Sequence, residues 1–176
     1  MKKAILIDRD GVLVEDIGYH YKLEDFKLIP NAVEGLKLLK KHKLFIITNQ
    51  SGIGRGIYEL EDFLKFNNHL IRELEKYKIK IEKTYCCPHK TEDNCDCRKP
   101  KMKFLKDAEK EFKIDLKKSY VIGDKKTDIE LGENGGCKTI LVLTGNGMET
   151  KNKIKADFVA EDLLEAAKWI LNNDRQ

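Results

Sequence analysis

The chain has 176 residues, of which 41% are hydrophobic and 36% are charged, a composition typical of a globular protein that buries its own core. Its net charge of +4, from 34 Lys and Arg against 30 Asp and Glu, is too small a surplus to indicate nucleic-acid binding. The first apolar run ends after four residues, so we expect no signal peptide, no membrane segment and a cytoplasmic location.

Short apolar runs alternate with amphipathic stretches along the whole chain. We expect strands at 4–8, 44–48, 83–87, 120–123, 139–143 and 156–160. Several of these runs are continuous rather than alternating, which is typical of strands buried on both faces of a sheet. The pattern therefore predicts an α/β fold, with a Rossmann-type parallel sheet flanked by helices.

Helical spacing of apolar residues fills the segments between these strands. Asn31 and Glu34 resemble a capping box after Pro30, which predicts the start of the first helix. The other helices are expected at 60–77, 101–113, 125–134 and 163–171. Neither of the two inserts, residues 12–29 and the cysteine loop 87–98, is long enough for a separate cap, so we expect one domain over 1–176 and a monomer.

The polar residues of greatest chemical interest follow four of the expected strands. In a parallel sheet the ligand site lies at the carboxyl ends of the strands. Asp8 and Asp10 follow the first strand, where one carboxylate can attack phosphorus and the other can protonate a leaving oxygen. Taken alone, the pair would be interpreted as two solvated aspartates at a turn.

The second and fourth strand ends supply groups that suit a phosphate and a divalent cation. Thr48 is followed by "NQSGIGRG", in which exposed backbone N–H groups and Arg55 favour an anion. Asp124 and Asp128 follow the fourth strand. We expect Asp124, Asp8 and a backbone carbonyl near Asp10 to hold Mg²⁺, which prefers oxygen ligands, with Asp128 outside this ligand set.

The cysteine loop "CPHKTEDNCDCRKP" contains a complete set of zinc ligands. Cys87, His89, Cys95 and Cys97 provide the four ligands of a closed tetrahedral site, which indicates a structural rather than a catalytic metal. The alternative is an accidental cluster of reduced thiols. Because Arg98 and Lys99 follow Cys97 directly, a folded loop would fix the direction of both cations.

The motifs "DRDG", "TNQSG", "RKP" and "GDKKTD", in this order, resemble the haloacid dehalogenase (HAD) superfamily of aspartate-dependent phosphatases over residues 4 to about 145. The resemblance implies a HAD-like fold without a large cap and a Mg²⁺-dependent phosphomonoesterase that forms an aspartyl phosphate. It assigns Asp8 as the nucleophile and Asp10 as the general acid and base. The remaining implied roles are stabilisation of the phosphoryl group by Thr48 and Lys99, and binding of Mg²⁺ by Asp8, Asp10 and Asp124.

The cysteine loop resembles a zinc loop of this superfamily, and the insert and the run "TNQSGIGRG" are similar to the branch that acts on heptose bisphosphates. This likeness implies a phosphorylated sugar as substrate, with Arg98 contacting a second phosphate. The implied substrate-binding residues are Asp16, Ile17, Gly18, Tyr19, Asn49, Gln50, Ser51, Arg55, Arg98 and Lys125. The chain departs from the pattern at Val12, in place of a threonine, and in the five residues between His89 and Cys95.

Three other functions remain open from the sequence. Histidinol phosphate is a rival substrate, because phosphatases specific for it carry a similar cysteine loop. A polynucleotide 3′-phosphatase has a similar "TNQ-x-GIGRG" run. A non-enzymatic zinc-knuckle interaction module would use the cysteine loop alone and would leave the strand-end motifs unexplained. His20 is expected at the surface, near the mouth of the pocket.

Overall fold

The structure, a computed structural model, describes residues 2–175 and contains one parallel sheet with the strand order β3-β2-β1-β4-β5-β6. The strands are β1 (Ala4–Ile7), β2 (Lys43–Asn49), β3 (Ile81–Cys87), β4 (Tyr120–Gly123), β5 (Lys138–Val142) and β6 (Phe158–Ala160). Every pair of neighbouring strands runs parallel. The predicted α/β class, with a parallel sheet flanked by helices, is confirmed.

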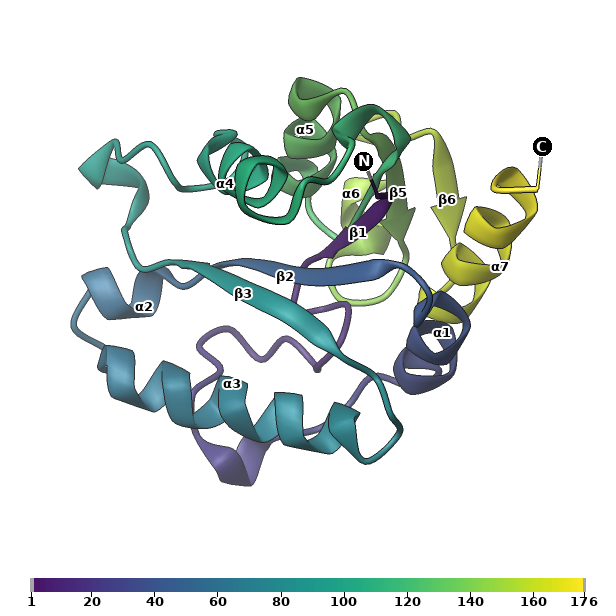
Figure 1. The fold of residues 1–176 in the computed structure, drawn as a ribbon. Helices are drawn as coiled ribbons and strands as arrows, with labels where there is room; N and C mark the ends of the chain where they lie inside the picture. The colour runs from purple at the N-terminus through teal and green to yellow at the C-terminus, as the bar shows by residue number, and fades with distance from the viewer. Residues whose placement is uncertain (1, 176) are drawn as a thin grey trace.

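Helices cover both faces of this sheet (Figure 1). They are α1 (Ala32–Leu39), α2 (Ser51–Gly54), α3 (Leu60–Glu75), α4 (Lys103–Phe112), α5 (Lys126–Gly135), α6 (Gly147–Thr150) and α7 (Leu163–Asn173), with 3-10 turns η1 (Leu23–Asp25), η2 (Thr91–Asp93) and η3 (Leu116–Lys118). The sequence did not predict α2 and α6, because a helix of four residues is too short to show a helical period.

The core forms two layers because successive residues of a strand point to opposite faces. In β1, Ile5 and Ile7 pack in the layer under α1, α3 and α7. Ala4 and Leu6 pack in the layer under α4 and α5. Both sides of β1 are therefore buried, as its continuous apolar run predicts.

One local prediction is wrong. Asn31 does not form a capping box with Glu34, because its backbone is left-handed (φ 65°) and its side chain donates to Asp162, 2.6 Å away, at the start of α7. On α3, Leu60 and Leu64 follow the apolar spacing but remain exposed, whereas Phe66 is fully buried. The buried face of this helix is formed by Phe63, Phe66, Leu70 and Leu74.

The sheet order brings three functional strand ends together. β1 lies between β2 and β4, and Ile7 pairs with Ile46 and Ile122. The segments that follow these three strands therefore emerge side by side at one edge. Within residues 2–175, the first insert folds only into η1 and the cysteine loop only into η2, so neither forms a cap domain.

None of the helices within residues 2–175 combines the length and the hydropathy that a bilayer-spanning segment needs.

Candidate active site

Three buried carboxylates meet at the carboxyl ends of β1 and β4. Asp8, Asp124 and Asp128 each place a carboxylate oxygen within 4.8 Å of the other two. Asp8 follows β1 directly, Asp124 follows β4, and Asp128 lies in the first turn of α5. Negative charges this close destabilise one another unless cations lie between them, so the cluster requires positive charge.

Lys99 supplies one such charge from the end of the cysteine loop. Its ammonium group lies 2.8 Å from Asp8 Oδ1, 2.7 Å from Asp128 Oδ1 and 2.8 Å from the carbonyl oxygen of Ile47. Burial alone would lower the pKa of Lys99, but the two carboxylates outweigh it and hold the pKa above its usual value. The lysine is therefore a permanent cation.

The backbone of Lys99 is fixed by the second strand. Its N–H donates to Asn49 Oδ1 at 3.0 Å, and Asn49 Nδ2 donates back to the Lys99 carbonyl at 3.4 Å. Asn49 is the last residue of β2, beside Thr48. The loop that carries the lysine is thus tied to the same sheet edge as the carboxylates.

Asp124 is shaped to receive a cation on one oxygen. Its Oδ2 accepts from the backbone N–H and the Nδ2 of Asn146, at 2.7 and 3.1 Å. Its Oδ1 is buried and has no hydrogen-bond partner among residues 2–175. Burial and the neighbouring Asp8 charge raise the pKa of Asp124 to about 7. An oxygen-coordinated divalent cation at this position would satisfy Oδ1 and offset the repulsion.

Two glycines allow this close approach. Gly11 and Gly145 both have positive φ values, 90° and 54°, and a Cβ on either would overlap the Asp124 carboxylate. Thr144 Oγ1 also donates to the Gly11 carbonyl at 2.7 Å. The loop after β5 is therefore packed against the turn after β1, with Asp124 between them.

Asp10 lies beside this cluster, and its carboxylate accepts hydrogen bonds from a separate set of donors. Arg9 Nε donates to Asp10 Oδ1 at 2.8 Å, and an Arg9 terminal nitrogen donates to Oδ2 at 3.0 Å. The guanidinium is fully buried and lies over the rings of Phe63 and Phe66 on α3, 5.2 and 4.9 Å from their centroids. Gln50 Nε2 donates to Asp10 Oδ2 at 2.7 Å.

His20 is buried, which contradicts the expected surface position. It is 1% exposed and its ring lies 5.1 Å from that of Phe66. Its Nε2 faces the carbonyl of Asp25 at 3.1 Å. The insert folds inward here because His20 and Arg9 both pack on the aromatic face of α3.

A cavity of about 380 Å³ opens over Asp10. Its wall includes most of the predicted substrate-binding residues: Asp16, Gly18, Tyr19, Asn49, Gln50, Ser51, Arg98 and Lys125. Two predicted residues lie elsewhere. Ile17 is 58% exposed outside the cavity wall, and Arg55 faces Glu92 at 3.4 Å.

Lys125 and Asp16 form a charged pair in the cavity wall, 2.7 Å apart. Asp16 also accepts from Gly18 N at 2.9 Å and from Asn146 Nδ2 at 3.3 Å. Burial alone would raise the pKa of Asp16, but Lys125 and these hydrogen bonds hold it below its usual value. The pair links the first insert to the start of α5.

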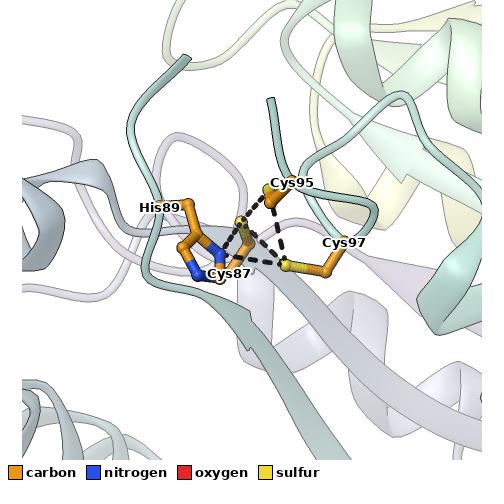
Figure 2. A group of neighbouring side chains, drawn as sticks. All are labelled: Cys87, His89, Cys95 and Cys97. Carbon is orange, nitrogen blue, oxygen red and sulfur yellow. Dashed lines mark hydrogen bonds between the residues drawn. The ribbon is translucent and has the colours of Figure 1, made fainter. Parts of the chain in front are cut away.

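The cysteine loop places four metal-ligand atoms together (Figure 2). The Sγ atoms of Cys87, Cys95 and Cys97 lie 3.2 to 3.6 Å apart, and His89 Nδ1 lies 3.7 Å from Cys87 Sγ and 3.3 Å from Cys97 Sγ. A tetrahedron with Zn–S bonds of about 2.3 Å has edges of about 3.8 Å. The four atoms therefore have nearly the spacing of a zinc site. Cys86 is outside the cluster.

Sequence reasoning missed Arg9, Tyr58 and Asn146. Asn146 follows the fifth strand, so the strand-end rule already indicated its segment, but only four strand ends were considered. Arg9 stands between the two aspartates of "DRDG", but its contacts with Asp10 and with Phe66 on α3 depend on tertiary packing that the motif does not reveal. No pattern in the sequence pointed to Tyr58.

A parallel sheet that gathers an Asp-x-Asp pair, a threonine, a buried lysine and two further aspartates at one edge defines a hydrolase of the HAD type. Consistently, a family model described as HAD-hydrolase-like matches residues 96–166.

Relatives identify the branch. The chain is 43% identical to D-glycero-α-D-manno-heptose-1,7-bisphosphate 7-phosphatase of Campylobacter jejuni, over 97% of this chain and 94% of the relative. It is 40% identical to D-glycero-β-D-manno-heptose-1,7-bisphosphate 7-phosphatase of Helicobacter pylori J99, over 96% of this chain and 97% of the relative. The chain therefore belongs to the HAD superfamily and, within it, to the family of heptose-bisphosphate 7-phosphatases.

A solved structure agrees with this placement. The D,D-heptose 1,7-bisphosphate phosphatase of B. bronchiseptica, crystallised with magnesium and phosphate, superposes with a TM-score of 0.90 at 28% identity, covering 97% of this chain and 99% of that chain. The resemblance stated from the sequence motifs is confirmed.

Proposed function

We propose that this protein is a Mg²⁺-dependent phosphomonoesterase that removes the 7-phosphate of D-glycero-D-manno-heptose 1,7-bisphosphate. The convergence of Asp8, Lys99 and Asp124 at one edge, with Asp10 beside them, is the observation that carries the proposal. The names of the relatives support the choice of substrate.

The first step uses both aspartates of "DRDG". An Asp8 oxygen attacks phosphorus and forms an aspartyl phosphate, while the bond to the sugar oxygen breaks. Asp10, in its protonated form, transfers its proton to that leaving oxygen. The Asp8 carboxylate is held ready by the Arg9 backbone N–H, which donates to Oδ1 at 2.8 Å.

The second step regenerates the enzyme. Asp10, now ionised, takes a proton from water as the water oxygen attacks phosphorus, which releases inorganic phosphate and the Asp8 carboxylate. The Lys99 ammonium and the Thr48 hydroxyl stabilise the negative charge on the phosphoryl oxygens in both steps. Lys99 is well placed for this, since it already touches Asp8.

Two metals complete the proposal. Asp8, Asp124 and the Asp10 carbonyl would hold Mg²⁺, which supplies charge neutralisation to the phosphoryl group. The unpartnered Oδ1 of Asp124 supports this site. Cys87, His89, Cys95 and Cys97 would hold a structural Zn²⁺, with all four positions taken by protein.

The second phosphate of the substrate is assigned to Arg98. One guanidinium nitrogen donates to the His89 carbonyl at 3.1 Å, and the side chain borders the cavity. The remaining N–H groups suit a bidentate contact with phosphate. We further propose a cytoplasmic monomer, which sedimentation at micromolar concentration would test.

The decisive experiment is phosphate release from a panel of phosphosugars, with Mg²⁺ and with excess chelator. We expect the highest kcat/KM on heptose 1,7-bisphosphate and no turnover without Mg²⁺. Histidinol phosphate and a 3′-phosphorylated oligonucleotide form the comparison arms, since each represents a rival substrate. A higher kcat/KM on either would overturn the substrate assignment, and inactivity on the whole panel would overturn the enzymatic one.

A further inference from the structure

The carboxamide of Gln50 connects two proposed catalytic groups. Its Nε2 donates to Asp10 Oδ2 at 2.7 Å and to Thr48 Oγ1 at 2.8 Å. Its Oε1 accepts from the hydroxyl of Tyr58 at 2.5 Å. Both amide hydrogens are therefore engaged within the protein, and the side chain is only 3% exposed.

The orientation of this amide is determined by its neighbours. Asp10 accepts hydrogen bonds from Arg9 on both of its oxygens, and whenever its carboxylate is ionised, as after the first step, it can only accept, so the nitrogen of Gln50 faces it. The oxygen then faces Tyr58, whose hydroxyl donates. Burial raises the pKa of Tyr58, so the phenol keeps this proton over the working pH range. A reversed amide would set two oxygens, those of Gln50 and Asp10, against each other.

Tyr58 is itself held firmly. Its ring stacks on that of Tyr21 with centroids 4.7 Å apart, and it is 4% exposed. A Cβ at Gly52 would overlap the ring, so α2 packs directly on it. The phenol hydroxyl thus has one fixed position, above Gln50.

We propose that Gln50 is a positioning residue, locked by Tyr58, that sets the placement of Asp10 relative to Thr48, rather than a residue that binds the sugar. Its amide has no hydrogen left to donate to a substrate hydroxyl or phosphate. Arg9 holds the other side of the same Asp10 carboxylate. The carboxylate of the general acid, Asp10, is therefore held on one side by the Arg9 guanidinium and on the other by the Gln50 amide.

This inference rests on the proposed phosphatase function. The test compares steady-state kinetics on heptose 1,7-bisphosphate for Tyr58→Phe, Gln50→Met and the double variant. Tyr58→Phe keeps the packed ring and removes only the hydroxyl. One lost hydrogen bond corresponds to a kcat lower by about 3- to 10-fold, and KM should stay within about twofold, because no substrate contact is lost.

Gln50→Met should lower kcat by about 100-fold, because two hydrogen bonds to catalytic groups disappear. Since Tyr58 acts only through Gln50, the double variant should be no slower than Gln50→Met. Tyr77→Phe is the matched control: Tyr77 is 45% exposed beyond the end of α3 and should change neither parameter. Thermal unfolding of each variant checks that the fold is kept.

A rise in KM that matches the loss in kcat/KM would show that Gln50 contacts the substrate and would overturn the inference. Wild-type kinetics in Tyr58→Phe, or additive effects in the double variant, would also overturn it. If Gln50→Met does not fold, the KM and kcat of Tyr58→Phe are sufficient to test the inference. An inactive wild-type protein would instead reject the proposed function.

Discussion

The Lys99 ammonium lies 2.7 Å from the Asp128 carboxylate, and both side chains are almost fully buried. The same ammonium contacts Asp8, so one lysine pairs with two carboxylates, one that follows β1 and one in the first turn of α5. Asp128 Oδ2 meanwhile accepts from the Lys125 backbone N–H at 3.0 Å and caps α5. Asp128 therefore both fixes the lysine and starts the helix after the β4 strand.

Breaking this ion pair should destabilise the fold and slow the reaction. In Asp128→Asn the amide oxygen can still cap α5, but the negative charge is lost. Removal of one partner of a buried pair costs about 3–5 kcal/mol. Because Asp8 remains beside Lys99, we expect a smaller loss here, of about 2–3 kcal/mol in the free energy of unfolding. Urea denaturation measures the difference.

Asp107→Asn is the matched control for this variant. Asp107 faces Lys103 at 3.4 Å on the exposed side of α4, where such a pair contributes about 0.5 kcal/mol or less. Equal losses of stability in Asp107→Asn and Asp128→Asn would contradict the role given to the buried pair.

The two aspartates of "DRDG" should respond differently to the same substitution. Asp8→Asn should abolish phosphate release, because the asparagine amide cannot replace the carboxylate as the attacking group that forms the covalent intermediate. Asp10→Asn should lower kcat by about 10²–10⁴-fold, the usual contribution of a general acid. Single-turnover assays distinguish them, and substantial turnover by Asp8→Asn would refute the nucleophile assignment.

Much of this site could be predicted because strand-end positions follow from the chain order. Once Asp8, Thr48 and Asp124 are read as ends of parallel strands, the sheet rule places them at one edge. The zinc ligands were equally predictable, since Cys87, His89, Cys95 and Cys97 have local spacing that needs no tertiary information.

Contacts between distant segments could not be predicted in this way. The stacking of Arg9 on Phe63 and the hydrogen bond from Tyr58 to Gln50 depend on how α3 and α2 pack, which no periodicity encodes. Asn31 failed as a capping residue for the same reason, because Asp162 of a remote helix start competes for its side chain.

Loss of one ligand from the cysteine loop should remove the metal and misplace Lys99. We expect purified protein to contain one Zn²⁺ per chain, and Cys97→Ser to contain little and to unfold at a lower temperature, since metal binding stabilises such loops. Activity should fall as well, because Lys99 is only two residues away. Mass spectrometry and thermal unfolding measure these effects.

Cys86→Ala provides the comparison for this variant, because Cys86 neighbours Cys87 but is not among the four clustered ligands. It should retain zinc. Loss of zinc from Cys86→Ala, or full zinc in Cys97→Ser, would argue against the predicted ligand set.

Arg98 should affect substrates with two phosphates more than those with one. We expect Arg98→Ala to lower kcat/KM on heptose 1,7-bisphosphate by about 10- to 100-fold, the range for a charged hydrogen-bonded contact. Activity on a hexose monophosphate should change little. Arg98→Lys should be intermediate, since an ammonium keeps the charge but not the bidentate geometry. Equal losses on both substrates would place Arg98 at the reacting phosphate instead.

Stability at acidic pH should depend on Asp174, whose partners Lys3, His42 and Tyr120 lie at the amino ends of β1, β2 and β4. Its carboxylate accepts from Lys3 Nζ at 2.8 Å and the Tyr120 hydroxyl at 2.9 Å, and lies 2.7 Å from His42 Nε2. Burial alone would raise the pKa of Asp174, but these partners outweigh it and hold the pKa below its ordinary value of 3.8.

A lowered pKa in the folded state means that Asp174 stabilises the protein above pH 3.8 and that this contribution disappears as the pH falls through the folded-state value. Asp174→Asn should therefore reduce the free energy of unfolding by about 1–2 kcal/mol at pH 7, and the difference from wild type should shrink below pH 3.8. Urea titrations at several pH values measure this dependence. A difference that stays constant down to the acid transition would mean that packing, rather than the charge of Asp174, stabilises this end of α7.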